Sequence, residues 1–138
     1  MEAKPVDITV AQNVDDWYGF IVYRIEPHDV VTIVNGVPTT TRNPGEQFNY
    51  AGWTFRATFR IKDAAGAVAM TLNNSHFSIR TDVPDFVGVK VIVMYIPRSL
   101  SAAVTAAGVY DVRARDPNNY EHRLAYGKYG LEAASTRD

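Results

Sequence analysis

Apolar and polar residues alternate most strictly between residues 52 and 62. The apolar positions of this run are Trp53, Phe55, Ala57, Phe59 and Ile61. The positions between them carry Thr, Arg or Lys, so the pattern predicts a half-buried antiparallel strand. Residues 63–66 end in a glycine and predict a tight turn. The apolar positions 68, 70 and 72 then predict the hairpin partner of this strand.

Shorter runs of the same kind occupy most of the remaining chain. They are residues 6–10, 17–25, 30–34, 75–80, 88–96, 108–116 and 122–129. Asn35 and Gly36 form a strong tight-turn signal after the third of these runs. Residues 99–107 predict the one helix, because Leu100 and Val104 are four positions apart. Ser99 is the expected N-cap of this helix, and Gly108 is the expected stop after it.

Many short strands, one short helix and no regular alternation of strands with helices predict an all-β protein. We expect an immunoglobulin-like antiparallel β-sandwich with the short helix before the penultimate strand; a small barrel is the alternative. With 138 residues, the chain is expected to form a single domain over residues 1–138. Residues 37–49 predict a long exposed loop, or the tip of an extended hairpin. Residues 132–138 are small and polar and predict a frayed tail.

The run 88–96 is apolar on both of its faces. The face expected to point inward consists of Val89, Val91, Val93 and Tyr95. The second apolar face consists of Ile92, Met94 and Ile96. A second apolar face needs a cover, which is either the helix 99–107 or another subunit. These three residues are therefore the first candidates for an interface.

Two further sets of residues are interface candidates. Val37, Thr40 and Arg42 belong to the predicted exposed loop. Arg113 and Arg115 lie on the expected outward face of strand 108–116, and arginine is enriched at interfaces. If this strand lies beside strand 52–62, their arginines form a basic stripe. The alternative is an ordinary solvated face whose charge is balanced by nearby Asp and Glu.

Composition removes several kinds of chemistry. The chain has no cysteine, which excludes disulfides, thiolate zinc ligands and a cysteine nucleophile. Its histidines, His28, His76 and His122, lack metal-ligand spacing, and no phosphate-binding glycine loop is present. A net charge of -1 gives no drive toward nucleic acid or an anionic membrane. We therefore expect no catalytic residue, metal or cofactor, and neither nucleic acid nor membrane as a partner.

The polar N-terminus and the absence of a long apolar run favour a soluble protein without a signal peptide.

Several short motifs occur together in a recognisable order. They are an aromatic strand after an acidic pair (residues 15–20), the Gly-Trp-Thr-Phe-Arg-Ala strand (52–57), the Leu-Ser helix start (100–105), Gly-Val-Tyr-Asp (108–111) and Thr-Arg (136–137). This order resembles the small immunoglobulin-like virion proteins of tailed bacteriophages. It is similar to the N-terminal domains of baseplate upper proteins and to minor tail proteins. Two segments depart from that pattern: the loop 37–49 is longer, and the run 87–96 is more apolar.

The resemblance implies a structural protein that assembles by docking onto other virion proteins. It implies a homo-oligomer in the particle, localisation in the virion after assembly in the host cytoplasm, and no catalysis. A capsid decoration or head-fibre protein is one alternative. A carbohydrate- or receptor-binding module is another, since Tyr and Trp suit both sugars and protein interfaces. That module requires exposed aromatics at one end of the sandwich, and the candidates are Trp17, Tyr18, Tyr50, Tyr120, Tyr126 and Tyr129.

Overall fold

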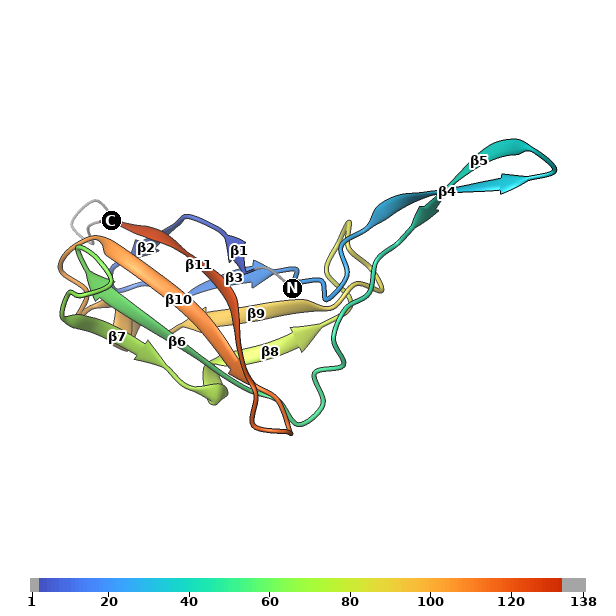
Figure 1. Ribbon diagram of the computed structural model, residues 1–138. Coiled ribbons are helices and arrows are strands. Elements are labelled where there is room, and N and C mark those ends of the chain that lie inside the picture. Colours follow the sequence, from blue (N-terminus) through green and yellow to red (C-terminus); the bar gives the residue numbers. More distant parts are fainter. Residues whose placement is uncertain (1–2, 133–138) are drawn as a thin grey trace.

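Two β-sheets form the body of the protein, and a two-stranded hairpin projects from one end of it (Figure 1). The computed structural model describes residues 3–132. The strands are β1 (Lys4–Pro5), β2 (Ile8–Ala11), β3 (Asp16–Phe20), β4 (His28–Val34), β5 (Val37–Asn43), β6 (Thr54–Ile61), β7 (Val68–Leu72), β8 (Phe77–Arg80), β9 (Val91–Ile96), β10 (Gly108–Arg115) and β11 (Glu121–Glu132). The helices are the short 3-10 turn η1 (Asn74–His76) and the single-turn α1 (Arg98–Ser101).

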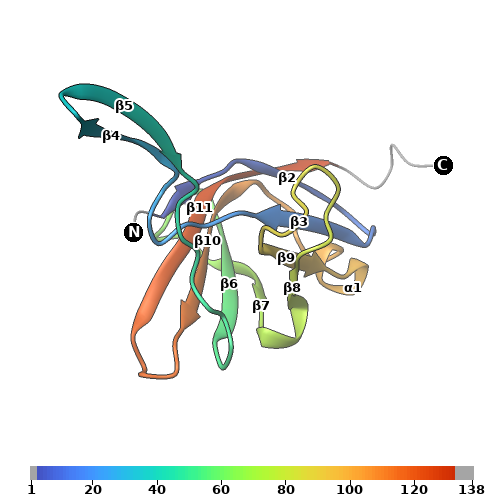
Figure 2. The same ribbon diagram turned by 90° about the vertical axis from the view of Figure 1, so that its right-hand side faces the viewer.

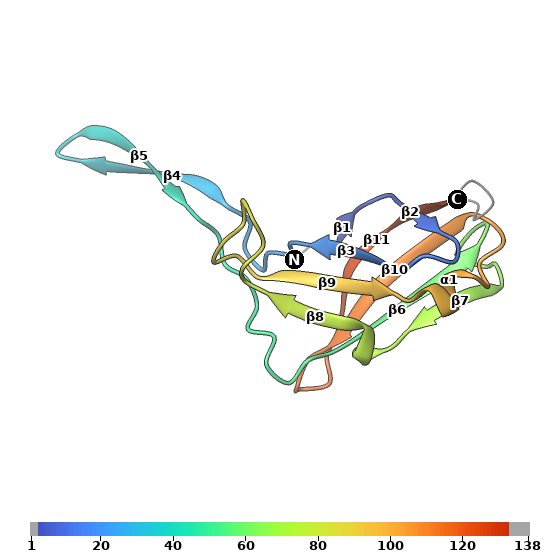
Figure 3. The same cartoon turned by 180° about the vertical axis from the view of Figure 1, so that it is seen from behind.

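The larger sheet has the strand order β1-β11-β10-β6-β7, and β2 also pairs with β11. The smaller sheet has the order β3-β9-β8 and lies in front of the larger one in the view of Figure 3. All pairings in the body are antiparallel except those of β1 and β2, which run parallel to β11. The prediction of an all-β sandwich with a short helix before the penultimate strand is confirmed.

The core lies between the two sheets. The inward side chains of β6 and β10 are those predicted from alternation: Phe55, Ala57, Phe59, Tyr110, Val112 and Ala114. Aromatic contacts join the sheets across this core. Phe20 of β3 lies 6.5 Å from Tyr110 of β10, and Phe55 of β6 stacks 5.7 Å from Phe77 of β8, measured between ring centroids. The larger sheet therefore covers the smaller one.

The prediction for the two faces of β9 is wrong. Ile92, Met94 and Ile96 are 0%, 0% and 1% exposed, so they point into the core and form no outer face. Val93 and Tyr95 lie on the other face and are half-buried. β9 is the central strand of its sheet, so both of its faces are apolar. Alternation then cannot tell inside from outside, because a shift of one residue exchanges the faces.

The helix is shorter than the nine residues predicted, and its ends differ. Its N-cap is Pro97, which makes no side-chain capping bond, so the assignment of Ser99 as N-cap is wrong. Gly108 is not a helix stop but the first residue of β10. A Cβ there would lie 1.8 Å from the carbonyl oxygen of Arg60, so only glycine fits. Leu100 and Val104 both pack against the core, as their spacing predicts.

A register shift explains one smaller difference from the prediction. Val68 is exposed although Met70 and Leu72 are buried, because the pairing of β6 with β7 shifts after Phe59. A second shift lies between β10 and β11. Glu132 pairs with Ala11 at the end of β11, whereas the rest of the tail predicted to fray lies outside the described residues.

Candidate docking interface

The most exposed element of the protein is the hairpin of β4 and β5, which we call the arm (residues 28–43). It extends away from both sheets of the body (Figures 1 and 2). Val34 pairs with Val37 across the turn, and the register continues to the pair of His28 with Asn43. Asn35 and Gly36 both have positive φ angles, 52° and 78°, which a type I′ hairpin turn requires. The sequence signal at these two residues is therefore confirmed.

The prediction of a loop over residues 37–49 is wrong for residues 37–43, which form β5. The alternative of an extended hairpin is the correct one. It brings three predicted interface candidates, Val37, Thr40 and Arg42, onto one exposed strand. Arg42 forms an ion pair with Asp29, its cross-strand partner, at 3.3 Å. Such an exposed pair contributes little free energy to folding.

The arm carries apolar side chains that no residue of the body covers. Val31, Ile33, Val34 and Val37 are 64%, 72%, 56% and 61% exposed. Cross-strand pairs share a face, so Val31 and Ile33 lie on one side of the arm together with Pro38. The remaining pairs place Val34 and Val37 on the opposite side. A two-stranded hairpin that exposes both faces is marginally stable in water, so this arrangement favours a binding partner.

Backbone hydrogen bonds hold the base of the arm. The amides of Arg24 and Ile25 donate to the carbonyl of Glu46 at 2.7 and 3.1 Å, and the amide of Glu46 donates to the carbonyl of Ile25 at 2.8 Å. An ion pair of 2.5 Å between Arg24 and Glu46 lies beside them. Gly45 has a φ of +80°, and a Cβ there would lie 2.6 Å from the carbonyl oxygen of Ile25. The two strands therefore leave the body through a paired junction, not through free loops.

Gln47 connects this junction to the smaller sheet. Its amide nitrogen donates to the carbonyls of Val22 at 3.4 Å and Lys90 at 2.8 Å. Its amide oxygen accepts from the backbone amide of Lys90 at 2.9 Å. The Lys90 ammonium donates to the carbonyl of Phe48 at 2.9 Å. These bonds attach the returning strand of the arm to the segment that precedes β9.

Sequence reasoning did not select Val31, Ile33 or Gln47. The pattern predicts a strand that contains Val31 and Ile33, and nothing local shows that this strand leaves the body. The available signal was the equal length of the β-branched runs on both sides of Asn35 and Gly36, which indicates a long hairpin. Gln47 gives no pattern, because its partners are 25 and 43 positions away.

The other predicted candidates, Arg113 and Arg115, lie on the outer face of the larger sheet. β6 and β10 are neighbours, and Arg56 is directly opposite Arg113. The predicted basic stripe therefore exists, but carboxylates lie within it. Glu121 contacts Arg56, Arg113 and Arg115, the last two at 3.9 and 3.6 Å. Much of this face is thus an ion-pair network, as expected of an ordinary solvated face whose arginines are balanced by nearby carboxylates.

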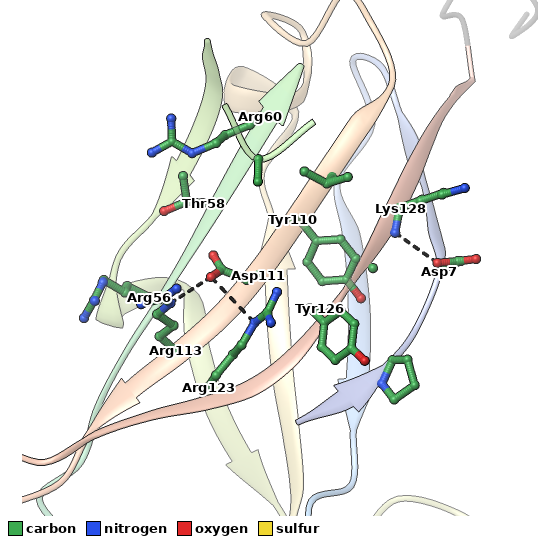
Figure 4. Close-up of a pocket in the computed structure, with 14 residues that line it drawn as sticks. Asp7, Arg56, Thr58, Arg60, Tyr110, Asp111, Arg113, Arg123, Tyr126 and Lys128 are labelled. Carbon is green, nitrogen blue, oxygen red and sulfur yellow. Dashed lines mark hydrogen bonds and ion pairs between the residues drawn. The ribbon is translucent and has the colours of Figure 1, made fainter. Parts of the chain in front are cut away.

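The same face contains an open hollow of about 780 Å³ (Figure 4). Asp111 lies at its centre, 2.7 Å from Arg113 and 3.9 Å from Arg123. At one end, the register aligns Arg60, Val109 and Lys128 in a row across three strands. The lining includes five basic and two acidic side chains, so the hollow is more cationic than the chain as a whole.

The exposed aromatic residues among the sugar-binding candidates do not gather at one end of the sandwich. Trp17 is 59% exposed and stacks on Tyr95 on the smaller sheet, with ring centroids 5.1 Å apart. Tyr120 is 69% exposed and follows β10 at the turn of the larger sheet. Tyr50 and Tyr129 are buried, so they are not sugar-stacking surfaces. Burial raises the pKa of Tyr50 to about 12.

The histidines remain apart. His122 stacks on Trp53, with centroids 4.8 Å apart, and its Nε2 lies 2.9 Å from a carboxylate oxygen of Asp116. This bond, with backbone amides of Tyr120 and Asn118, lowers the pKa of Asp116. Within residues 3–132, no group of three or more His, Asp or Glu side chains is placed to hold a metal ion. No helix in that range is long and apolar enough to cross a membrane.

No protein-family model matches the chain, and no curated protein matches it.

Proposed function

We propose that this chain is a structural component of a tailed bacteriophage virion that docks non-covalently onto neighbouring tail or baseplate proteins through the arm. The observation that carries the docking role is the exposure of Val31, Ile33, Val34 and Val37 on both sides of a projecting hairpin. The virion role rests on the order of motifs described above. A capsid decoration or head-fibre protein would use the same surface at another position on the particle.

Docking is favoured over carbohydrate binding by the placement of side chains. Trp17 lies on β3 of the smaller sheet and Tyr120 lies in the turn between β10 and β11, so these exposed aromatics do not form one site. Among the described residues, four of the seven exposed large aliphatic side chains lie on the arm. Aliphatic side chains gain free energy from contact with another protein by leaving water, at about 25 cal/mol per Å². They offer no flat ring for a sugar to stack on. The body then serves as the rigid support of the arm.

Incorporation into particles tests this function. An epitope-tagged copy of the chain is supplied during infection by the phage that encodes it, and purified particles are assayed by immunoblot and immunogold labelling. We expect the tagged chain in the particles, with label on the tail or baseplate. A chain absent from purified particles would contradict the virion role. Label on the head would replace the tail position with the decoration role.

A pair of charge substitutions tests the arm. We expect Ile33→Asp to lower incorporation at least tenfold, because it places a carboxylate on the proposed contact surface. Val68→Asp is the matched control: Val68 is an exposed aliphatic residue on edge strand β7 of the body. Equal loss for both variants, or for neither, would contradict docking through the arm.

A further inference from the structure

The two edges of the arm differ in their free backbone groups. In a two-residue hairpin, the pair that closes the turn is hydrogen-bonded, and bonded and non-bonded pairs alternate along the ladder. The Val34 and Val37 pair is therefore bonded, and the amides of Asp29, Val31 and Ile33 point away from β5. The corresponding outward positions on β5 are 38, 40 and 42.

Proline closes one of these edges. Pro38 has no N–H, so the outer edge of β5 lacks a donor close to the turn. The outer edge of β4 has a donor and an acceptor at every outward position from Asp29 to Ile33. An open edge of this kind is a template for another strand. The geometry of the arm therefore directs strand addition to β4.

Taking the arm as the docking element of the proposed function, we propose that two copies of this chain pair along β4, antiparallel and about a two-fold axis at Val31. Val31 then lies opposite Val31 of the second copy, and Asp29 lies opposite Ile33 of the second copy. The outward-pointing backbone N–H and C=O groups of residues 29, 31 and 33 in each copy then bond to the other copy, which yields about six hydrogen bonds. Moving the axis to position 30 or 32 leaves some of those groups unpaired.

The side chains of β4 are compatible with this self-pairing. Asp29 is the one acidic residue of β4, and in this register it lies opposite an isoleucine and not opposite a like charge. Its own partner Arg42 remains on β5, at 3.3 Å. His28 lies opposite Val34 of the second copy. No repulsive pair is therefore created between the two copies.

Pairing also resolves the marginal stability of the arm. Two hairpins joined along β4 form a four-stranded sheet, above the three strands that a stable sheet needs. Val31, Ile33 and Pro38 of both copies then form one continuous apolar face. Because the arm holds β4 away from the body, the edge is accessible to a second arm (Figures 1 and 2).

Proline substitutions at two paired positions test the proposal. Val31 and Thr40 face each other in a non-bonded pair, so Val31→Pro and Thr40→Pro each remove one outward N–H and place the same ring in the arm. Sedimentation equilibrium is measured for the full-length protein across a concentration series. We expect a dimer for the natural chain, at least tenfold weaker dimerisation for Val31→Pro, and an unchanged dimer for Thr40→Pro. A natural chain that stays monomeric up to about 1 mM would overturn the proposal. So would equal effects of the two variants.

Cysteine cross-linking tests the register without disturbing the arm. Paired Cα atoms in a hydrogen-bonded antiparallel pair lie about 5.5 Å apart, within disulfide range, and the chain has no other cysteine. We expect Val31→Cys to form a disulfide-linked dimer under mild oxidation and Thr40→Cys not to do so. Cross-linking by Thr40→Cys alone would overturn pairing along β4.

The particle assay is independent of these tests of self-pairing. A chain that enters particles but stays monomeric contradicts only the self-pairing, and a dimer absent from particles contradicts only the virion role.

Discussion

At the scale of single residues, the apolar side chains of this protein divide into two energetic classes. Ile92 and Met94 are fully buried and surrounded by other core residues, so truncating them leaves a cavity. Ile33 is 72% exposed on the arm and contacts mainly water in the free chain. The same substitution therefore has very different consequences at the two sites.

We expect Ile92→Ala to lower the free energy of unfolding by about 3 kcal/mol. Ile33→Ala should change it by less than about 0.5 kcal/mol in dilute monomeric protein, because it removes no buried contact. Urea denaturation followed by circular dichroism measures both values. A small effect at Ile92 would contradict its place in the core. The face of β9 formed by Ile92, Met94 and Ile96 would then again be a candidate interface.

Two buried tyrosines differ in one hydrogen bond. The hydroxyl of Tyr110 donates to the carbonyl of Val6, whereas that of Tyr129 has no partner among the described residues. An unpaired buried hydroxyl is destabilising, so Tyr129→Phe should raise the free energy of unfolding by about 1 kcal/mol. Tyr110→Phe is the control and should lower it by a similar amount. Denaturation midpoints that fall for both variants would indicate a partner for the Tyr129 hydroxyl.

Asp116 should make the free energy of unfolding depend on pH in the acidic range. Its pKa is lowered in the folded protein, chiefly by the bond to His122. A lowered pKa favours folding above the unfolded-state pKa of about 4, and this contribution is lost as the pH falls through the folded pKa. Asp116→Asn should therefore lower the melting temperature at pH 6 and have a smaller effect at pH 3. An equal effect at both pH values would show that the carboxylate charge contributes nothing.

At the scale of elements, the arm keeps a fixed orientation relative to the body only if the hydrogen bonds at its base remain intact. Gln47 makes three hydrogen bonds that connect the base of the arm to the smaller sheet. In one of them, its side-chain oxygen accepts from the backbone amide of Lys90. The strands of the arm share no core contact that could replace these bonds. The junction is thus the local determinant of the direction in which the arm points.

We expect Gln47→Ala to loosen the junction without unfolding the body. The loss leaves partly buried backbone groups unpaired, at a local cost of about 1–3 kcal/mol. Amide hydrogen exchange of Glu46 and Lys90 should accelerate about tenfold or more, while amides of β10 serve as an internal control and stay unchanged. Uniform acceleration across the protein would indicate a global effect.

At the scale of the whole molecule, the body and the arm are energetically separate. Residues 31–43 of the arm are all exposed, and none belongs to the core cluster. Replacing residues 28–43 by a short Gly-Ser linker shortens a loop and removes no core contact, so its effect on folding is small. We expect the melting temperature of the body to change by less than about 4 °C, measured by calorimetry. A much larger drop would show that the arm folds as one unit with the sheets.

The fold could be predicted largely because its elements follow from local rules. The alternation along β6 and β10 placed Phe59 and Val112 inside, and a buried face with period two admits no other register. The exposure of the candidate interface residues could not all be predicted in the same way. β9 is apolar on both sides, so contact with the facing sheet sets which side is inward, and the prediction for Ile92 from the pattern is wrong.

Local residue patterns suffice to locate the strands and the turns, since backbone sterics and side-chain alternation act within a few residues. The positive φ angles of Asn35 and Gly36 and the buried face of β6 belong to this class. The folded structure shows in addition which of two apolar faces is buried, that β4 and β5 leave the body, and that Arg56, Arg113 and Glu121 share one network. These features depend on contacts between residues tens of positions apart, and such contacts form only when the whole chain has folded.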